Sequence, residues 1–551
     1  MSDTNDSPAG GPDFTLDNLR RQAKLLLKQA RSGDPVLIAR LRALLPRLAS
    51  LDDATVQADI KLADIHHAVA RKNGKSSWRE LTAFMKRVDP IHVHGARFLL
   101  ALRDHDTAHA KAMLDAHPEL ARYSIHCAAA VGNPSLVAAF LAKDVRLATS
   151  GFQPDGPEPL IYACHMGLQS LLGVTEIDRV RTVQLLLDAG ASANAYIRVG
   201  DHGEAHIPAL YFACVSDNVA VARLLLERGA NPNDGESVYH AAEMNHRECL
   251  ELLAAHGAEL SAAHSQWGNT PLYFLAGYKE SDHRCGTATL GMQWLLAHGA
   301  NPNVLSHVNA GTDDPRGVAE APLHRVASFG REVAVARMLV EHGAVVDLPR
   351  GDGKSAYALA MRTGNMGVAT YLAECGANTA ALTPVDRFLA ACIGADEHAA
   401  RAILATHPAL MSELTAEDRQ TLALAVERDR EASVRLMFAL GWVPSDEGEW
   451  GGTPLHWAAW HGRVNMVRVL LECGAPVNVR DRTYGSSPIA WASHGSTNAR
   501  PGNDADYVAV TEMLLDAGAT RAESYNKWGE SPENMASTAV AQLLRARGFA
   551  G

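Results

Sequence analysis

Two short motifs in this chain contain residue types that carry out chemistry in other proteins. Gly353-Lys354-Ser355 matches the end of a phosphate-binding loop, in which backbone amides and a lysine hold phosphate groups. That loop requires a glycine five residues before Gly353, and Leu348 stands there. His202-Gly203-Glu204 has the His-x-Glu pair of zinc deaminases, but no Pro-Cys-x-x-Cys follows it. Neither motif predicts a nucleotide or zinc site.

Histidine and cysteine are numerous but scattered. The chain has 25 histidines and 8 cysteines, and the cysteines stand singly along the sequence. Isolated cysteines of this kind are typical of small buried side chains in a reducing compartment. Catalysis would need a nucleophile, a base and an orienting group that converge, and the sequence offers no such combination. We therefore expect no catalytic residue, no cofactor and no metal.

A sequence repeat is expected to position the functional side chains of this chain. Its cleanest copy runs from Gly452 to Ala475. Its reference position is His456, the residue after the leucine of Thr-Pro-Leu-His. The equivalent positions elsewhere are Leu99, His126, Ile161, Tyr211, Tyr239, Tyr273, His324, Ala358, Leu389, Ala423 and Ala490. Most steps lie near 33 residues, and the two long steps are one period plus an insertion. Such a period predicts a stacked array in which each unit buries its apolar face on its neighbours.

Each segment of the repeat has a physical reason. Thr453 and Pro454 favour a helix start, because a hydroxyl can cap exposed amides and proline suits the first turn. A second helix is predicted over residues 463–472, which place apolar side chains at helical spacing. Gly474 favours the end of that helix, because glycine readily adopts positive φ past a helix C-terminus.

These residues make the chain similar to the ankyrin-repeat family. The family pattern Thr-Pro-Leu-His-x-Ala-Ala, followed by a helix ending Leu-Leu-x-x-Gly-Ala, matches roughly residues 95–550. The resemblance implies an all-α fold, an α-solenoid of about twelve stacked helix pairs with hairpin fingers and a concave binding face. It also implies that the motif histidine bonds the backbone of the neighbouring hairpin.

In this family, the residues that select a partner follow the Ala-Ala pair or lie at the hairpin tips. The candidate contacts are Trp460, His461, Phe329, Tyr278, Met244, Trp267, Trp450 and Trp528. Exposed aromatic side chains often anchor interfaces. Packing remains an equal explanation for the three hairpin tryptophans, because tryptophan before a hairpin glycine is frequent in the family. Trp457 and Trp491 fall at a position that usually holds leucine, so we expect them in the core.

Insertions offer a second candidate surface. Compared with the eighteen residues from His456 to Gly474, the intervals 161–190, 273–299 and 490–518 carry eleven, eight and ten extra residues. Residues 305–320 also lengthen a hairpin. Long loops are often binding loops, although such insertions can equally be neutral. We expect at least one of them to be functional.

The first ninety residues differ from the repeats. Residues 1–13 are small and polar and are predicted to be a disordered tail. Residues 14–90 are predicted to form a helical N-terminal domain, and 91–551 the repeat array with a C-terminal cap. The helices of the N-terminal domain are expected at about 16–30, 35–48, 54–72 and 77–87. This domain resembles a helical segment found ahead of ankyrin arrays in bacterial proteins. The resemblance rests on Lys61-Leu62-Ala63-Asp64, Ala70-Arg71-Lys72-Asn73-Gly74 and Ser77-Trp78.

Charge changes at the same boundary. Residues 1–90 hold 15 Lys+Arg and 11 Asp+Glu, a net +4; the whole chain holds 51 and 62, which leaves 36 and 51, a net −15, for the remainder. Phosphate binding needs clustered cations, so this charge argues against a nucleic acid partner. No apolar run approaches the ~20 residues that span a bilayer, and the N-terminus is polar. We therefore expect a cytoplasmic protein with no membrane contact.

The sequence thus favours a non-catalytic scaffold of the bacterial cytoplasm for protein-protein interaction. The expected partner is a protein that the sequence does not identify. It would bind through the concave face, the hairpin tips and the loop insertions. The alternative is an enzyme or effector whose activity lies in an insertion or in the N-terminal region.

Overall fold

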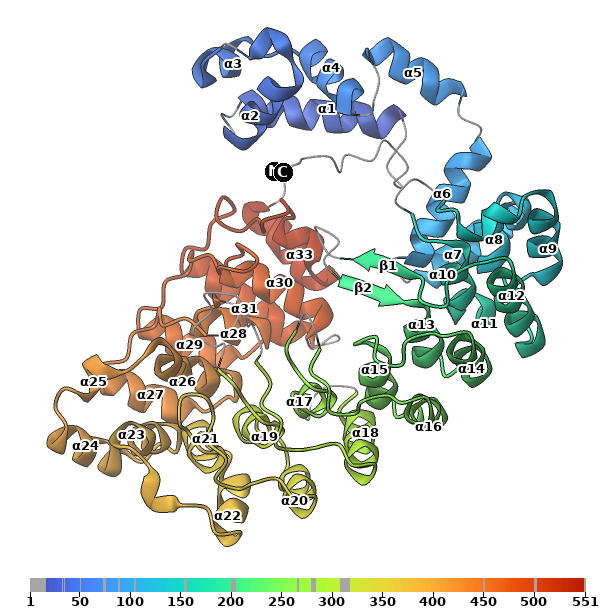
Figure 1. Cartoon of the computed structure of the whole chain (residues 1–551). Helices are drawn as coiled ribbons and strands as arrows, with labels where there is room; N and C mark the ends of the chain where they lie inside the picture. The colour runs from blue at the N-terminus through green and yellow to red at the C-terminus, as the bar shows by residue number, and fades with distance from the viewer. Residues whose placement is uncertain are drawn as a thin grey trace. The chain divides into compact units, whose positions relative to one another are not determined.

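The computed structural model divides by its internal contacts into two compact units, residues 1–259 and 260–551 (Figure 1). It describes residues 16–31, 33, 35–49, 51–72, 76–87, 90–103, 106–152, 156–199, 205–264, 267–278, 284–307, 318–448, 451–499 and 503–549. The predicted tail 1–13, the motif His202-Gly203-Glu204 and Trp450 lie outside these residues.

The first unit is built almost entirely from helices. Its α-helices are α1 (Leu16–Arg31), α2 (Pro35–Leu44), α3 (Asp53–Asp59), α4 (Leu62–Lys72), α5 (Trp78–Arg87), α6 (Pro90–Arg103), α7 (Thr107–Ala116), α8 (Ile125–Ala130), α9 (Pro134–Lys143), α10 (Pro159–Cys164), α11 (Met166–Leu171), α12 (Glu176–Asp188), α13 (Ala209–Val215), α14 (Val219–Glu227), α15 (Ser237–Glu243) and α16 (Arg247–Ala255). Single 3₁₀ turns are η1 (Pro46–Leu48), η2 (Pro118–Arg122) and η3 (Val145–Thr149). Strands β1 (Tyr196–Val199) and β2 (Ala205–Pro208) pair antiparallel, with Ile197 opposite Ile207.

The N-terminal helices bury an apolar cluster of their own, which includes Leu19, Ile38, Ile65 and Leu81. The prediction of one helix over 54–72 is wrong, because two helices, α3 and α4, cover this stretch. The backbone of Ile60 is extended, with φ −63° and ψ 129°. The carboxylate of Asp64 then accepts a hydrogen bond from the backbone N–H of Lys61 (3.0 Å) and caps the start of the second helix.

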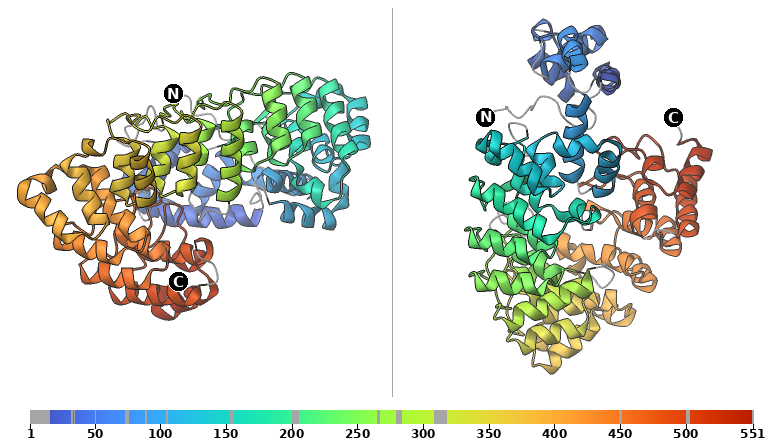
Figure 2. Two further views of the ribbon diagram at one scale, coloured as in Figure 1. Left: turned by 90° about the horizontal axis from the view of Figure 1, so that it is seen from below. Right: turned by 90° about the vertical axis from the view of Figure 1, so that its right-hand side faces the viewer.

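The second unit continues the pattern of short helix pairs. Its α-helices are α17 (Pro271–Ala276), α18 (Cys285–Ala297), α19 (Pro322–Phe329), α20 (Val333–Glu341), α21 (Ala356–Thr363), α22 (Met366–Glu374), α23 (Pro384–Ile393), α24 (Glu397–Thr406), α25 (Leu410–Glu413), α26 (Ala416–Glu427), α27 (Glu431–Ala439), α28 (Pro454–Trp460), α29 (Val464–Glu472), α30 (Pro488–Asn498), α31 (Asp504–Asp516), α32 (Pro532–Met535) and α33 (Thr538–Leu544). Single-turn helices are η4 (Thr379–Ala381) and η6 (Arg545–Phe549). In Figure 2 the yellow and orange helices of this unit lie in rows.

The repeat chemistry acts as predicted. Pro454 begins α28, and Gly474 follows α29 with φ 79°. His456 is buried, its Nδ1 accepts the backbone N–H of Thr453 (3.0 Å), and its Nε2 contacts the carbonyl oxygen of Ser486 (3.0 Å). The imidazole therefore joins its own helix start to the next hairpin. His126 and His324 make equivalent contacts with the carbonyl oxygens of Ser150 (2.7 Å) and Leu348 (2.8 Å).

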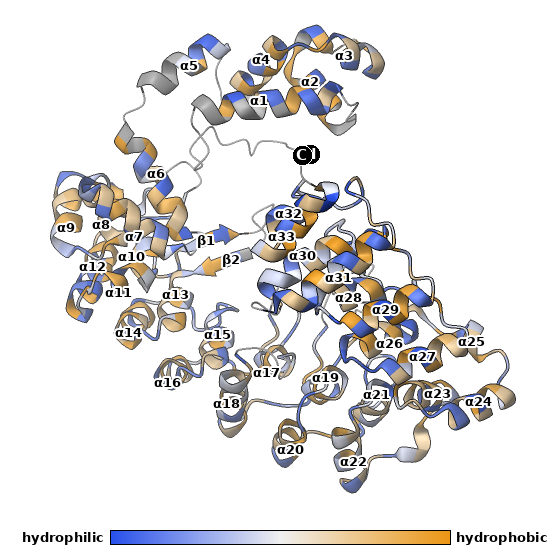
Figure 3. Cartoon of the chain, turned by 180° about the vertical axis from the view of Figure 1, so that it is seen from behind, coloured by the Kyte–Doolittle hydropathy of each residue, from blue (hydrophilic) through white to orange (hydrophobic). Residues whose placement is uncertain are grey.

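All three long intervals contain additional helical residues. Interval 161–190 contains the short helix α11, interval 273–299 contains the 13-residue α18, and interval 490–518 contains most of α30 and all of α31. The first helix of the α30–α31 pair extends to Asn498 and, with 11 residues, is longer than the seven-residue α28. In Figure 3 much of α28, α29 and α31 is orange, in agreement with the apolar side chains that these helices bury.

Candidate partner-binding site

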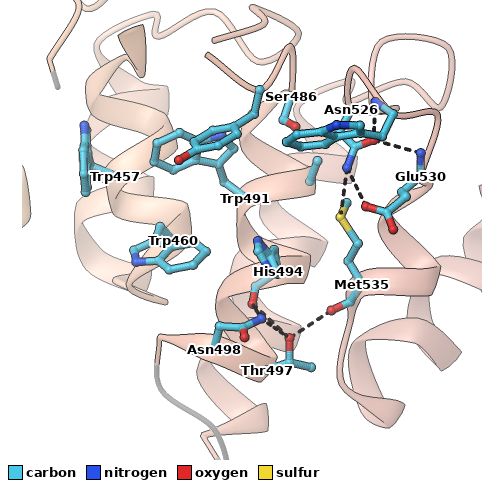
Figure 4. Close-up of a pocket in the computed structure, with 13 residues that line it drawn as sticks. Trp457, Trp460, Ser486, Trp491, His494, Thr497, Asn498, Asn526, Glu530 and Met535 are labelled. Carbon is cyan, nitrogen blue, oxygen red and sulfur yellow. Dashed lines mark hydrogen bonds between the residues drawn. The ribbon is translucent and has the colours of Figure 1, made fainter. Parts of the chain in front are cut away.

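Two of the predicted contacts, Trp460 and Trp528, line the same pocket (Figure 4). Its volume is about 620 Å³. The residues that line it are Trp457, Trp460, Tyr484, Ser486, Ala490, Trp491, His494, Thr497, Asn498, Asn526, Trp528, Glu530 and Met535. We call this site the aromatic pocket. It is formed by α28, α30, the end of α32 and the two hairpins that precede α30 and α32.

Close helix packing fixes the position of Trp460. A Cβ atom at Gly495 would lie 2.3 Å from the carbonyl oxygen of Trp460, so only glycine lets α30 approach α28 this closely. The same carbonyl oxygen accepts a hydrogen bond from the hydroxyl of Tyr507 (2.7 Å), which is fully buried in α31. The backbone under Trp460 is therefore held by two neighbouring helices.

Trp491 forms one wall and is held by a hairpin carboxylate. Its indole Nε1 donates to Oδ2 of buried Asp481 (3.0 Å), which also accepts from the backbone N–H of Ser486 (2.8 Å). The ring of Trp491 meets that of Trp457 edge to face, with centroids 5.3 Å apart, and that of Trp460 at 6.1 Å. These aromatic contacts make a rigid cluster.

Trp457 and Trp491 are 8% and 7% exposed, so the expectation that both lie in the core is confirmed. The remaining exposed edges of these two rings nevertheless line the aromatic pocket. They are core residues that also form a surface.

The opposite wall is a hairpin that Asn526 organises. Its Oδ1 accepts from the backbone N–H groups of Trp528 (3.1 Å) and Glu530 (2.9 Å), and its Nδ2 donates to Oε2 of Glu530 (2.8 Å). The same amide nitrogen contacts the sulfur of Met535 at 3.7 Å (Figure 4). Trp528 is 63% exposed, and the centroid of Tyr484 lies 6.2 Å from its own.

The electrostatics of the aromatic pocket are simple. Glu530 is the one charged side chain among the described residues that line it. Lys527 does not line the pocket, but its Nζ lies 4.6 Å from the ring centroid of Trp528. The nearby imidazole of His456 is buried beneath the site, and burial lowers its pKa to about 4.

The other predicted contacts lie apart from this pocket. His461 stacks on Trp457 with centroids 6.1 Å apart but does not line it. Phe329 is covered by the guanidinium of Arg325, whose carbon is 4.2 Å from the ring centroid. Three further candidates line no part of the pocket: Tyr278, half-buried against Phe274; Met244, half-buried after α15; and Trp267, 52% exposed beside His264.

Reasoning from sequence missed most of the polar lining. Thr497 and Asn498 lie in the lengthened part of α30, within the insertion 490–518 that was expected to be a candidate surface. Asn526 and Glu530 carried no such signal, because short polar hairpins occur in every repeat.

The residues that could carry chemistry do not converge. Lys354 of the phosphate-loop-like motif forms ion pairs with Asp352 and with Glu417 (3.4 Å), and Ser355 caps α21. Within the described ranges, no three His, Cys, Asp or Glu side chains form a group that could hold a metal ion. All cysteines are free thiols, and burial raises the pKa of Cys127 and Cys164 to about 12. These two thiols are therefore poor nucleophiles.

Comparison with known proteins identifies the repeats. A family model of ankyrin repeats (3 copies) matches residues 125–236, 174–264 and 388–481. The chain therefore contains ankyrin repeats, which generally mediate protein-protein interaction. None of the described helices has the length and apolar character needed to cross a membrane.

Two curated proteins are similar over part of their length. The ankyrin repeat domain-containing protein SAT10 of Stachybotrys chartarum is 22% identical over 354 residues, 62% of this chain and 17% of that protein. The probable E3 ubiquitin-protein ligase XBOS33 of Oryza sativa subsp. japonica is 30% identical over 226 residues, 33% of this chain and 42% of that protein. The chain thus spans less than half the length of either relative.

Proposed function

We propose that this chain is a non-catalytic scaffold that binds a protein partner through the aromatic pocket. In this proposal about twelve ankyrin-type units form the array, and residues 14–90 form a separate helical domain ahead of it. The protein acts in a bacterial cytoplasm. Candidates such as Tyr278 and Phe329 extend the contact along other repeats.

The observation that carries the proposal is the gathering of four tryptophans around one pocket. Trp460, Trp528 and the edges of Trp457 and Trp491 face a common space, and the backbone beneath Trp460 is held by α30 and α31. Tryptophans in well-packed pockets dominate binding energy at interfaces, and each typically costs 2 kcal/mol or more when truncated. A rigid support also lowers the entropy cost of ordering the site.

Affinity capture tests this function. Tagged wild-type chain and the Trp460→Ala/Trp528→Ala double variant would be exposed to a lysate of the organism that encodes the protein. Partners would be identified by mass spectrometry, purified, and titrated against each variant. We expect affinity to fall at least ~30-fold in the double variant, the equivalent of about 2 kcal/mol.

Trp267→Ala is the matched control, because Trp267 is also exposed but lies outside the aromatic pocket. Its affinity for the same partner should stay within twofold or so of the wild type, as for an energetically neutral contact. A partner that binds the double variant as tightly as the wild type would contradict docking at this pocket. Circular dichroism would verify that each variant is folded.

A second candidate is enzymatic and rests on the name of one relative, the probable E3 ubiquitin-protein ligase. Its test is ubiquitin transfer by the isolated chain in the presence of activating and conjugating enzymes. Transfer above the background of a reaction without the chain would replace the scaffold proposal.

A further inference from the structure

We propose that the aromatic pocket binds the alkylammonium group of a lysine side chain on the partner protein. This inference rests on the function proposed above and assigns a chemistry to its binding site. The observations that carry it are the exposed ring surfaces, the single carboxylate, and a cation that the protein itself holds between aromatic rings elsewhere.

The ring surfaces suit a cation. Trp460, Trp491, Trp528 and Tyr484 all line the pocket, and the negative π-faces of such rings attract a cation within about 6 Å of the ring centroid. The ammonium of Lys527, 4.6 Å from the centroid of Trp528, illustrates this attraction on a residue outside the lining.

The charge of the pocket selects the same ligand. Glu530 contributes one negative charge, and neither lysine nor arginine is among the described residues that line the site. Oε2 of Glu530 accepts from Asn526, and Oε1 accepts a hydrogen bond from none of the described residues. The carboxylate of Glu530 is exposed beside the aromatic rings, where its charge is complementary to a cation of the partner.

An intramolecular example shows that this fold can hold a cation between rings. The guanidinium carbon of Arg325 lies 4.6 Å from the centroid of Tyr273 and 4.2 Å from that of Phe329. Its Nη1 donates to the hydroxyl of Tyr273 (3.0 Å). Arg325 follows the repeat histidine directly, and Trp457 holds that same position in α28. At this position, α28 therefore carries an aromatic ring, whereas α19 carries a cation that lies between two rings.

The polar lining favours an ammonium group over a guanidinium. A guanidinium carries five N–H donors in a fixed plane and needs several acceptors. Here Asn526 is already committed to Trp528 and Glu530, and the hydroxyl of Thr497 lies 3.0 Å from the carbonyl oxygen of Met535. A group with few N–H donors, which Glu530 can satisfy, fits such a site better.

Peptide titration tests the inference on the full-length chain. The probes are Gly-Gly-Lys-Gly-Gly, the same peptide with Nε-trimethyl-lysine, and a norleucine peptide, whose side chain has the four carbons of lysine without the ammonium group. Binding would be followed by tryptophan fluorescence. We expect both cationic peptides to bind at least tenfold more tightly than the norleucine peptide. Equal affinity for all three, or no response to either cationic peptide, would overturn the inference.

Two variants separate charge from shape. In Glu530→Gln the advantage of the cationic peptides over norleucine should fall at least threefold, whereas Glu374→Gln, a change of an exposed glutamate on α22, should leave it intact. An unchanged advantage in Glu530→Gln would contradict the role of the carboxylate.

The source of the ammonium is tested with choline. Choline binding without lysine-peptide binding would overturn the assignment to a partner's lysine and point to a free small molecule. If the captured partner still requires Trp460 and Trp528 while the peptides do not discriminate, the scaffold function stands and this inference alone fails.

Discussion

The middle repeats, α17–α27, and the C-terminal repeats, α28–α33, use the same helix position in opposite ways. In α19 the residue after the repeat histidine is Arg325, which lies between the rings of Tyr273 and Phe329. In α28 and α30 the equivalent residues are Trp457 and Trp491, whose exposed edges line the aromatic pocket. At this helix position a cation of the chain itself covers two aromatic rings in α19, whereas α28 and α30 present aromatic edges to the pocket.

Other arginines of the middle repeats also make internal contacts. Arg428 donates to the carbonyl oxygen of Ser328 (3.3 Å), and Arg430 donates to those of Gly364 and Ile393 (both 3.1 Å). These bonds link helix ends that are distant in sequence and satisfy exposed carbonyls. The same repeat fold thus uses its side chains for internal contacts in the middle repeats and for lining a pocket in the C-terminal repeats.

The largest loss of unfolding free energy is expected when the buried ion pairs of the middle repeats are broken. Arg362 is buried between Asp386 (2.9 Å) and Asp418. Arg362→Met leaves two buried carboxylates without their cation, so the free energy of unfolding should fall by about 3–5 kcal/mol. Urea unfolding followed by circular dichroism measures this. Arg401→Ala removes a solvent-exposed pair with Glu397 and should cost less than about 1 kcal/mol.

If Arg362→Met is no more destabilising than Arg401→Ala, the account of the middle repeats is wrong.

Acid should weaken the C-terminal repeats through His456. Burial lowers its pKa to about 4 in the folded chain, whereas the unfolded chain has a value of about 6.5. Above pH 6.5 both states are neutral and the residue has no effect on stability. As the pH falls from 6.5 to 4, the unfolded state binds the proton first, so up to about 3 kcal/mol of stability is lost.

Urea titration at pH 7.5 and at pH 4.5, followed by tryptophan fluorescence, measures this loss. In His456→Asn the unfolding free energy should fall less between pH 7.5 and pH 4.5, by a large part of the ~3 kcal/mol that His456 contributes in the wild type. An identical pH dependence in the variant and the wild type would exclude His456 as its source.

The close packing beneath Trp460 offers a third test. Gly495→Ala would place a methyl group 2.3 Å from the carbonyl oxygen of Trp460, and such overpacking typically costs 1–3 kcal/mol. Trp460 should shift, and partner affinity should fall with stability. Gly286→Ala, where no atom lies within 4 Å, should be neutral or slightly stabilising because alanine favours the helix. Equal stability of the two variants would argue against this packing account.

A fourth change would make the C-terminal repeats resemble the middle ones. Thr497→Lys adds an internal ammonium to the rim of the aromatic pocket, and it should compete with a cationic ligand. We expect about a tenfold loss of affinity for the lysine peptide, equivalent to about 1.4 kcal/mol. Thr497→Met has a similar length without charge and should lose much less. Equal loss in both variants would indicate steric blocking only.

The sequence predicted the repeats well because their signals are local. The helix starts at Pro454 and the stops at Gly474 depend on residues close in the chain, and the contact of His456 with a hairpin carbonyl was expected from the family. The break at Ile60 was missed because apolar spacing continues across it, while two residues, Ile60 and Lys61, separate the helices and Ile60 is extended.

The aromatic pocket could be predicted only in part. Trp460 and Trp528 were candidates, but nothing in the sequence placed them together. Their meeting depends on the length of α30 and on the close approach that Gly495 permits. Glu530 gave no signal at all, because its role comes only from the rings that surround it.

The most direct test of the central claim is ¹⁹F NMR of the chain labelled with 5-fluorotryptophan, titrated with the captured partner. The chain has 9 tryptophans, and replacing each with phenylalanine assigns its resonance. Partner docking at the aromatic pocket predicts shifts of Trp460, Trp491 and Trp528, with exposed Trp267 and Trp294, which is buried in α18, unchanged. Shifts confined to Trp267 or Trp294, with the pocket resonances unmoved, would contradict it.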